Sequence, residues 1–284
     1  MMVERFKPVG IGNETVLKKI IDKQCIEKNT ADRNGKVRES LYASDVFQCP
    51  RKIFFQFFPD KYVSEEFDPR TIRIFQNGDS VHERLSQYLH REKAIRFIEE
   101  SDIPRDELEV HGRCDGLALI DGRLTVIEFK SINKTSVTEP KEEHMGQITW
   151  YMAMWNRLRL ELREDFNIQE ETIVTEELLK GELGISGRYY EDLEPYEQLC
   201  LLSSSEPVGE LIYESKQNQA LFNFSVEWNT DRIAKVRAWF EMVKWHVDRE
   251  IVPLVRYPKD KFPCRWGFNQ TAGQCAFYKQ CHDE

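Results

Sequence analysis

The sequence predicts an α/β protein in which helices flank a β-sheet. Two stretches, 110–130 and 210–228, alternate like strands on either side of a short loop, which is typical of hairpins. Three longer stretches, at 81–100, 140–163 and 230–250, place apolar residues at helical spacing. With 284 residues, 40% of them hydrophobic, the chain can build the core of one large domain, with or without an elaboration.

Composition and charge narrow the possible classes of protein. The formal charge of -9 argues against a general nucleic-acid coat protein, but acidic metal ligands can accompany a local basic groove, so a nuclease stays possible. The first residues lack the apolar run of a signal peptide, and no stretch approaches the roughly 20 apolar residues that span a membrane. We therefore expect a cytoplasmic protein without a membrane partner. Seven cysteines, an odd number, indicate metal ligands or plain thiols and not a disulfide framework.

The hairpin at 110–130 is the most informative stretch. Asp121 and Gly122 tolerate the positive φ angles of a two-residue turn, so we expect them at its tip. The register that follows pairs Ile120 with Arg123, Leu119 with Leu124, Leu117 with Val126, Asp115 with Glu128, and Arg113 with Lys130.

Two acids, Asp115 and Glu128, therefore face each other on the predicted sheet. Like charges directly opposite each other destabilise a sheet. The pair needs a reason to exist, and a bound divalent cation supplies one. Arg113 and Lys130 lie two residues farther from the turn and point to the same side.

The part of the chain before this hairpin is expected to be mainly helical. A short helical pattern around 14–28 is peripheral, and the aromatic-rich run 44–58 begins with Ser44 as its N-cap. Residues 77–80 predict a loop and cap, followed by a helix of about five turns over 81–100.

His82 shares the apolar face of the predicted helix over 81–100 with Leu85 and Leu89, so its imidazole is expected to point inward.

The part after the hairpin combines helices with a second hairpin. Pro140 is placed to start a helix that runs to about Arg163 and is apolar on more than one side. On it, Gln147 and Tyr151 lie one turn apart on the same face. Residues 165–206 mix acidic and apolar runs and are interpreted as an insertion or lid. After the second hairpin, Pro253 marks the end of the helix over 230–250.

Hydrolysis of a phosphodiester would give these polar residues a common role. A divalent ion neutralises the phosphate, activates water and stabilises the leaving group. Asp115 and Glu128 would be its hard oxygen ligands, Lys130 would position or deprotonate the water, and His82 would be a third ligand. Each residue also has an ordinary structural interpretation. Glu128 and Lys130 could form a solvated edge of the sheet, and His82 could be a core histidine. Gln147 and Tyr151 could be a buried polar pair without contact to a substrate.

The motifs GDSVHERL, GRCDGL, IEFKS and GQITWYM, in this order, resemble those of the RecB-like branch of the PD-(D/E)XK nuclease superfamily. Cys114 stands where the superfamily name has a proline. The resemblance extends from about residue 44 to the C-terminus, apart from 165–206. It implies a restriction-endonuclease-like mixed β-sheet flanked by helices and an Mg²⁺- or Mn²⁺-dependent DNA exonuclease acting on single strands or DNA ends. The residues it implies are Asp115, Glu128, Lys130, Gln147 and Tyr151 for catalysis, and His82, Asp115, Glu128 and Phe129 at the metal.

Four cysteines suggest a second site. Cys264, Cys275 and Cys281 lie near the C-terminus, and Cys49 precedes Pro50-Arg51-Lys52 more than two hundred residues earlier. This arrangement resembles the iron-sulfur nucleases of the AddB type and of the CRISPR-associated spacer-processing exonuclease family, in which such cysteines hold a 4Fe-4S cluster. The gap after Cys264 is longer than in that family. A zinc site, with His282 as a substitute ligand, and reduced thiols are the alternatives.

The remaining expectations concern organisation and partners. We expect a peripheral segment over 1–43, a nuclease domain over 44–255, and a cysteine-rich end over 256–284 joined to Cys49. Arg51, Lys52 and Arg113 are candidate DNA contacts, and Phe54 and Phe55 could either stack on bases or pack. The chain has no ATP-binding loop of the GxxxxGK[ST] type, so a helicase would be a separate partner.

The pathway stays open among recombination, repair, phage DNA metabolism and CRISPR adaptation, in a bacterial, archaeal or phage-infected cell. The rival interpretation is a non-catalytic DNA-binding or assembly subunit with structural metal sites.

Overall fold

The computed structural model describes residues 16–33, 38–62, 64, 67–169, 172–181, 190–254, 275–278 and 281. Its elements are α1 (Val16–Arg33), the 3₁₀ turn η1 (Ala43–Asp45), α2 (Pro50–Phe57), α3 (Pro69–Arg91), β1 (Arg96–Asp102), β2 (Arg113–Ile120), β3 (Arg123–Ile132), α4 (Glu142–Asp165), α5 (Glu176–Gly181), η2 (Tyr190–Asp192), α6 (Pro195–Leu202), β4 (Val208–Ser215), β5 (Leu221–Val226) and α7 (Thr230–Asp248).

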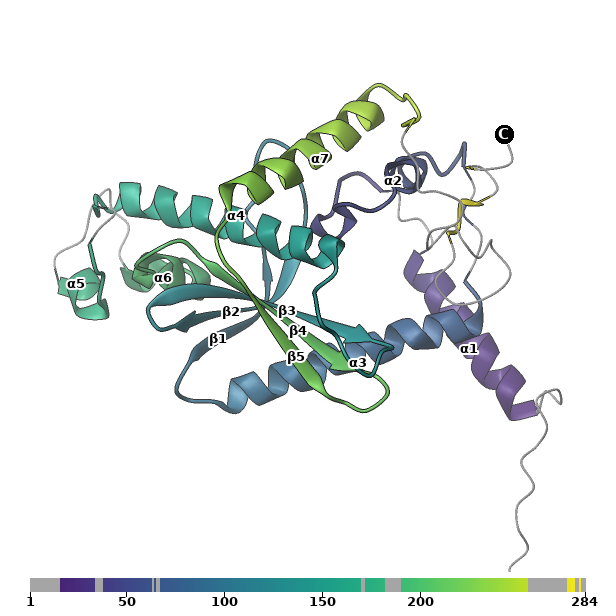
Figure 1. Ribbon diagram of the computed structural model, residues 1–284, viewed down its shortest axis with the longest axis horizontal. Coiled ribbons are helices and arrows are strands. Elements are labelled where there is room, and N and C mark those ends of the chain that lie inside the picture. Colours follow the sequence, from purple (N-terminus) through teal and green to yellow (C-terminus); the bar gives the residue numbers. More distant parts are fainter. Residues whose placement is uncertain are drawn as a thin grey trace, which may run out of the picture.

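The five strands form one mixed sheet in the order β1-β2-β3-β4-β5 (Figure 1). Only β3 and β4 are parallel, and the other neighbouring strands are antiparallel. A parallel pair needs a long crossover, which α4, α5 and α6 provide between β3 and β4. The predicted architecture of a mixed β-sheet flanked by helices is confirmed.

Helices cover both faces of the sheet. Alternate residues of β2 and β3 point to opposite sides, so Leu117 and Val126 join the core under α4, α6 and α7. Ala118 and Ile127 face the other side, where α3 packs on them with Val81. Figure 1 shows α4 and α7 on one side of the sheet and α3 on the other. The candidate active-site residues lie between these two helical layers.

The turn and inner register of the first hairpin are confirmed. Asp121 and Gly122 have φ angles of 50° and 73°, and the ladder runs from Ile120 opposite Arg123 to Gly116 opposite Ile127. Beyond that point β2 continues only with β1, and β3 continues with β4.

The outer half of the predicted register is therefore wrong. Asp115 does not pair with Glu128 in the ladder, nor does Arg113 with Lys130, because the two strands separate after Gly116. Asp102 on β1 is the strand partner of Arg113 instead.

Two predictions about the segment 77–100 are also wrong. The loop expected at 77–80 is helical, because α3 begins much earlier at Pro69, where the side chain of Asp68 accepts a hydrogen bond of 3.0 Å from the amide of Thr71. The expected helix ends at Arg91, and residues 96–102 form the edge strand β1. Pairing with β2 decides this, and Gly116 leaves the space that the ring of Phe97 occupies.

The other elements agree with the pattern more closely. Cys49 and not Ser44 is the N-cap of α2, with Pro50 in its first turn. Helices α4 and α7 and the hairpin of β4 and β5 lie where they were expected. Within the segment interpreted as an insertion or lid, however, α6 belongs to the core, because Leu199, Cys200 and Leu201 are buried beside α4.

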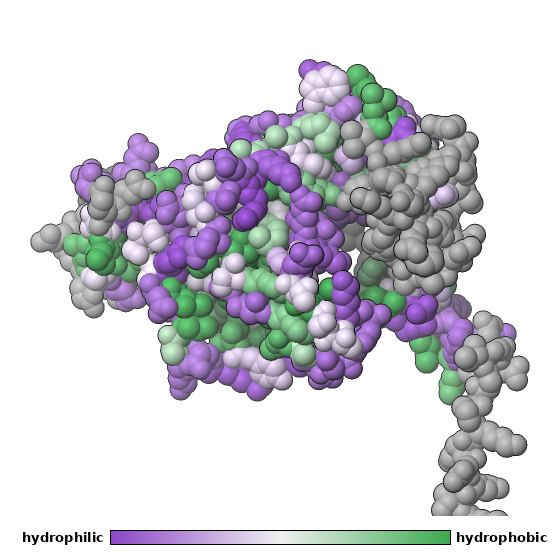
Figure 2. All heavy atoms as spheres, in the orientation of Figure 1, coloured by the Kyte–Doolittle hydropathy of each residue, from purple (hydrophilic) through white to green (hydrophobic). Residues whose placement is uncertain are grey.

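The visible face carries both hydrophilic and apolar side chains, as Figure 2 shows. The exposed apolar side chains include Val16, Leu17 and Ile20 on α1. Among the described helices, none is long and apolar enough to cross a membrane.

Candidate active site

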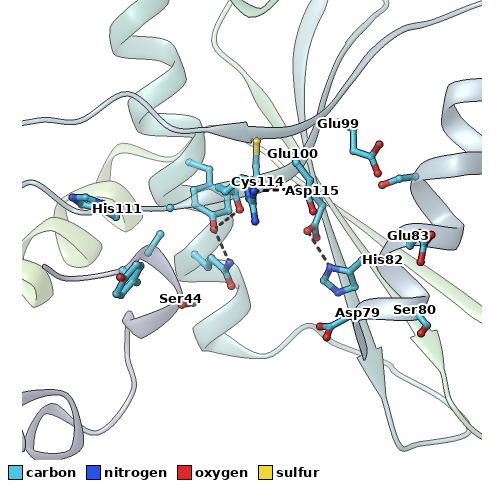
Figure 3. Close-up of a pocket in the computed structure, with 17 residues that line it drawn as sticks. Ser44, Asp79, Ser80, His82, Glu83, Glu99, Glu100, His111, Cys114 and Asp115 are labelled. Atoms are coloured by element: carbon cyan, nitrogen blue, oxygen red, sulfur yellow. Dashed lines mark hydrogen bonds and ion pairs between the residues drawn. The ribbon is translucent and has the colours of Figure 1, made fainter. Parts of the chain in front are cut away.

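Asp115 lies in the fork where β2 and β3 separate. Its Oδ2 atom accepts a hydrogen bond of 2.6 Å from the backbone amide of Phe129. That amide is bound to a side chain and not to a β2 carbonyl, which explains why the ladder ends at Gly116 and Ile127. The second oxygen, Oδ1, is 3.0 Å from Nδ1 of His82 on α3. A dashed line marks this interaction in Figure 3.

Glu128 is almost fully buried, with 2% of its surface exposed. Its Oε1 atom pairs with the ammonium group of Lys130 and accepts a hydrogen bond of 2.8 Å from Nε2 of Gln147. Its Oε2 atom is buried without a hydrogen-bond partner. Burial raises the pKa of Glu128 to about 7, against the charge of Lys130 and aided by the charge of Asp115.

Helix α4 supplies the wall next to Glu128. Besides Glu128, Nε2 of Gln147 donates to the hydroxyl of Tyr151 at 2.8 Å, and this hydroxyl donates to the carbonyl of Arg113 at 3.1 Å. Burial raises the pKa of Tyr151 well above its usual value, so the phenol stays neutral and can donate. A chain of hydrogen bonds therefore runs from β3 through α4 to the start of β2.

His82 occupies the opposite wall, as its inward-facing position predicted. Burial alone would lower the pKa of His82, but the hydrogen bond and charge of Asp115 outweigh burial and raise it. The imidazole can therefore neutralise Asp115 when it is protonated.

A cleft of about 800 Å³ opens onto this site. Figure 3 shows Asp115 in the middle, with side chains of α3 on one side and Ser44 and His111 on the other. Its charged residues are mainly acidic, with carboxylates from Asp79, Glu83, Glu99, Glu100 and Asp115 against the one guanidinium of Arg113. Glu128 lies beneath the surface behind Gln147 and Tyr151, which both line the cleft.

The donor set fits a hard divalent cation. Two carboxylates are typical ligands of Mg²⁺, and an imidazole beside them also suits Mn²⁺. In the described part of the chain, no three histidine, cysteine, aspartate or glutamate side chains already converge as metal ligands would. Lys130 and His82 instead neutralise Glu128 and Asp115 individually. The buried Oε2 atom of Glu128 is the observation that fits an ion, because an unsatisfied buried oxygen costs about 1–3 kcal/mol unless a ligand binds it.

Phe129, the remaining residue expected at the metal, could contribute only its carbonyl oxygen. Its side chain is 1% exposed and packs under α3 with Val81 and Leu85, and its amide binds Asp115.

Comparison with known proteins supports the fold. No known family profile matches the chain, and no curated protein matches it. The crystal structure of SSO0001 has a TM-score of 0.51 at 14% identity, over 95% of this chain and 98% of that one. The chain shares the fold of SSO0001. The crystal structure of an alkaline exonuclease, LHK-Exo, from Laribacter hongkongensis has a TM-score of 0.44 at 14% identity, over 79% of this chain and 94% of that one.

The three candidate DNA contacts lie in different environments. Arg113 lines the cleft, where it forms an ion pair of 3.1 Å with Glu100. Nη1 of Arg51 donates to the carbonyl of Cys281 at 3.1 Å, so this side chain connects α2 to the chain end. Lys52 donates to Gln48, which lies just before α2, at 3.0 Å.

Phe54 and Phe55 have a packing role and not a stacking role. They are 1% and 2% exposed and form a small core with Phe277 and two of the predicted cluster ligands, Cys275 and Cys281. Neither ring reaches the cleft.

Three of the four predicted cluster cysteines lie among the described residues, where they do not converge as metal ligands would. Cys49, Cys275 and Cys281 are buried, and burial followed by the charge of Cys49 raises the pKa of Cys275, to which Cys281 also contributes. Cys264 and the alternative ligand His282 lie outside the described residues. Cys114 and Cys200 are buried elsewhere, beside Ser101 and Trp155.

Sequence reasoning missed the other wall of the cleft. Tyr42 and His111 both line it and are joined by an isolated parallel bridge, although sixty-eight residues separate them in the chain. Tyr42 lies in no periodic or motif-like stretch, and His111, at the start of the predicted hairpin, has no strand partner that the sequence indicates, so only the folded chain reveals the pair.

Proposed function

We propose that the chain is a divalent-metal-dependent DNA nuclease, acting as an exonuclease on single-stranded DNA or DNA ends. One observation carries the proposal: the buried Oε2 atom of Glu128, without a partner, lies on the carboxylate that also binds Lys130, next to the fork that holds Asp115. A purely structural ion pair would satisfy both oxygens of a buried carboxylate.

The residues would divide the work as follows. Asp115 and Glu128, with His82 and the carbonyl of Phe129, would hold Mg²⁺ or Mn²⁺, which supplies charge neutralisation at the phosphate and lowers the pKa of water. The ammonium group of Lys130 would position the attacking water and stabilise the charge that develops on the phosphate oxygens.

Gln147 and Tyr151 act one step away from the phosphate. Gln147 holds Oε1 of Glu128 at 2.8 Å and so leaves Oε2 directed away from α4's hydrogen-bond chain. Tyr151 holds Gln147 and the backbone at Arg113 in place. Their hydrogen bonds fix the orientation of the carboxylate before substrate binds.

The test is metal-dependent cleavage of labelled single-stranded DNA by the purified full chain with Mn²⁺, compared with Lys130→Ala. We expect cleavage by the wild type, loss of about 10²-fold or more in Lys130→Ala, and unchanged cleavage in Lys93→Ala, whose exposed lysine lies in the turn before β1. Absence of cleavage, or equal cleavage by wild type and Lys130→Ala, would reject the proposal and favour a non-catalytic DNA-binding subunit.

A 4Fe-4S cluster is proposed for the second site, with Cys49, Cys264, Cys275 and Cys281 as ligands. The burial of Cys49, Cys275 and Cys281 supports it, because soft thiolates in a buried site are typical metal ligands. Such a cluster would hold α2 to the chain end. Anaerobically purified protein should be brown and contain iron and sulfide, whereas a colourless protein with stoichiometric zinc would reject the cluster in favour of zinc.

Partners and pathway follow from the same proposal. DNA is the proposed substrate, and a helicase or recombination protein a proposed partner in the cytoplasm of a bacterial, archaeal or phage-infected cell. Cleavage of blunt and tailed duplexes with and without a candidate helicase would test the partnership.

A further inference from the structure

Tyr42 and His111 form an aromatic surface at the end of the cleft away from α3. Their ring centroids are 6.1 Å apart with an interplanar angle of 69°, and both residues line the cleft. Tyr42 is 45% exposed, unlike the aromatic residues of the core. We propose that this pair, the aromatic platform, stacks an unpaired nucleobase of the strand whose phosphate lies at Asp115. This inference rests on the proposed function and adds a base-binding position to it.

The platform is held rigidly before any ligand arrives. The amide of Ala43 donates to the carbonyl of His111 at 2.7 Å, and the amide of His111 donates to the carbonyl of Leu41 at 2.8 Å. The guanidinium of Arg38 lies 5.0 Å from the centroid of the Tyr42 ring and supports it. An aromatic surface that is already ordered loses little side-chain entropy when a base stacks on it.

The platform also lies at a useful distance from the candidate active site. His111 precedes Asp115 by four residues, so the two Cα atoms are at most about 13 Å apart along an extended strand. At the rise of about 3.4 Å per stacked nucleotide, this distance corresponds to at most about four nucleotides.

Gly112 brings the platform close to α4. A Cβ atom at Gly112 would lie 2.7 Å from Cε1 of Tyr151 and 3.0 Å from Cβ of Ala43. Because Gly112 has no side chain, Ala43 of η1 and the ring of Tyr151 can both pack against the backbone next to His111. The aromatic platform and the hydrogen-bond chain of Tyr151 therefore share one wall of the cleft.

The charges of the cleft argue that stacking contributes to affinity. Carboxylates of Asp79, Glu83, Glu99 and Glu100 line it, and Arg113 is already paired with Glu100. These acids repel phosphates, so phosphate neutralisation alone is a weak source of binding here. Stacking is insensitive to that repulsion, because every base presents a π-face to an aromatic ring. The aromatic platform therefore contributes binding affinity that the acidic walls of the cleft cannot provide.

The experiment separates binding from cleavage by using full-length Lys130→Ala in Mg²⁺ with fluorescein-labelled single-stranded oligonucleotides. Affinity is measured by fluorescence anisotropy for this protein and for double variants that add Tyr42→Ala, Tyr42→Phe, His111→Ala or Tyr88→Ala. Tyr88 is the matched control, since it is an exposed tyrosine on α3 that does not line the cleft. Each protein is also tested on oligonucleotides with a single abasic site at successive positions.

We expect Tyr42→Ala to weaken binding about tenfold, His111→Ala to weaken it less, and Tyr42→Phe and Tyr88→Ala to change it by less than about twofold. When Tyr42 is present, an abasic site at one position of the oligonucleotide should weaken binding as much as Tyr42→Ala does. In Tyr42→Ala, the same abasic site should not weaken binding further. A variant that merely folds less well would weaken binding to every oligonucleotide and would not show this dependence on one base. For the protein with Lys130 intact, the same position should lie within about four nucleotides of the cleaved bond.

An abasic profile that is identical with and without the Tyr42 ring would overturn the platform, as would an oligonucleotide affinity unaffected by both Tyr42→Ala and His111→Ala. If the wild type cleaves DNA but the abasic profile does not depend on Tyr42, only the proposal of the aromatic platform is rejected. If the Tyr42-dependent position is present but the wild type does not cleave, only the proposed catalysis fails. Failure to bind any oligonucleotide rejects both.

Discussion

The backbone amide of Phe129 donates a hydrogen bond of 2.6 Å to the carboxylate of Asp115 across the fork between β2 and β3. This single bond replaces a rung of the ladder and holds the aspartate at the point where the strands separate. It also orients Asp115 so that its other oxygen meets His82. The fork thus positions a carboxylate that an uninterrupted hairpin would place in a closed pair.

Asp115→Asn should separate charge from geometry. The asparagine oxygen can still accept from the amide of Phe129, so the melting temperature should stay within a few degrees of the wild type. Metal-dependent cleavage should fall about 10²-fold or more because the ligand charge is lost. Asp115→Ala leaves the amide without its partner and should cost a further 1–3 kcal/mol of unfolding free energy, approximately. Full activity in Asp115→Asn would contradict a ligand role.

The metal-free protein should become less stable as pH rises from about 5 to 8. Burial raises the pKa of Glu128 from 4.5 to about 7, so the folded state binds more protons than the unfolded state in this window, and stability falls as pH increases. The raised pKa of His82 acts in the same direction. Urea unfolding in EDTA at several pH values measures the slope.

The matched variant for this pH dependence is Glu128→Gln, which cannot titrate and should flatten the slope below about pH 7. A divalent ion requires the ionised carboxylate, so the affinity of the wild type for Mn²⁺ should increase with pH up to about 7 and then level off. Calorimetry at pH 6 should detect protons released on binding. Equal slopes in the wild type and Glu128→Gln would exclude Glu128 as the titrating group.

Tyr151→Phe should weaken the site without emptying the core. It removes the hydroxyl that joins Gln147 to the carbonyl of Arg113 but keeps the buried ring. We expect a loss of about 0.5–1.5 kcal/mol in unfolding free energy and a roughly tenfold lower kcat with little change in KM. Leu158→Ala is a useful comparison because it truncates α4 away from the cleft and should affect stability more than turnover. A Tyr151→Phe enzyme with normal kcat would show that the hydroxyl has only a structural role.

Gly112→Ala should lower kcat by more than its loss of thermal stability would explain. The new Cβ atom would lie 2.7 Å from the ring of Tyr151, so this ring must shift and loosen its hydrogen bonds. Overpacking of this kind costs about 1–3 kcal/mol. Gly209→Ala offers a control on β4, where the Cβ atom meets the flexible ends of Ile148 and Met152. At equal losses of thermal stability, only Gly112→Ala should lower kcat; a parallel loss in both would point to destabilisation alone.

Local chemistry was sufficient to predict much of this architecture. Turn residues with positive φ placed the tip of the first hairpin, because Asp121 and Gly122 tolerate that conformation. Helical periodicity located α4 and α7 and turned His82 inward, since apolar stripes must face a core.

Long-range contacts decided the rest. The helical pattern over 81–100 predicts helix for residues 96–100, yet they belong to β1, because β2 offers them a strand partner that no local pattern reveals. The alternation of side chains along a strand placed Asp115 and Glu128 on one side of the hairpin. It could not predict that the carboxylate of Asp115 would bind the amide of Phe129 and end the ladder.

Spacing and side-chain type thus predicted Asp115, Glu128, Lys130, Gln147 and Tyr151 as candidate site residues, because the chemistry of a motif is local. The fork, the unpartnered oxygen of Glu128 and the pairing of Tyr42 with His111 arise only when distant segments meet. Burial and hydrogen-bond partners depend on those meetings, so they belong to the tertiary structure.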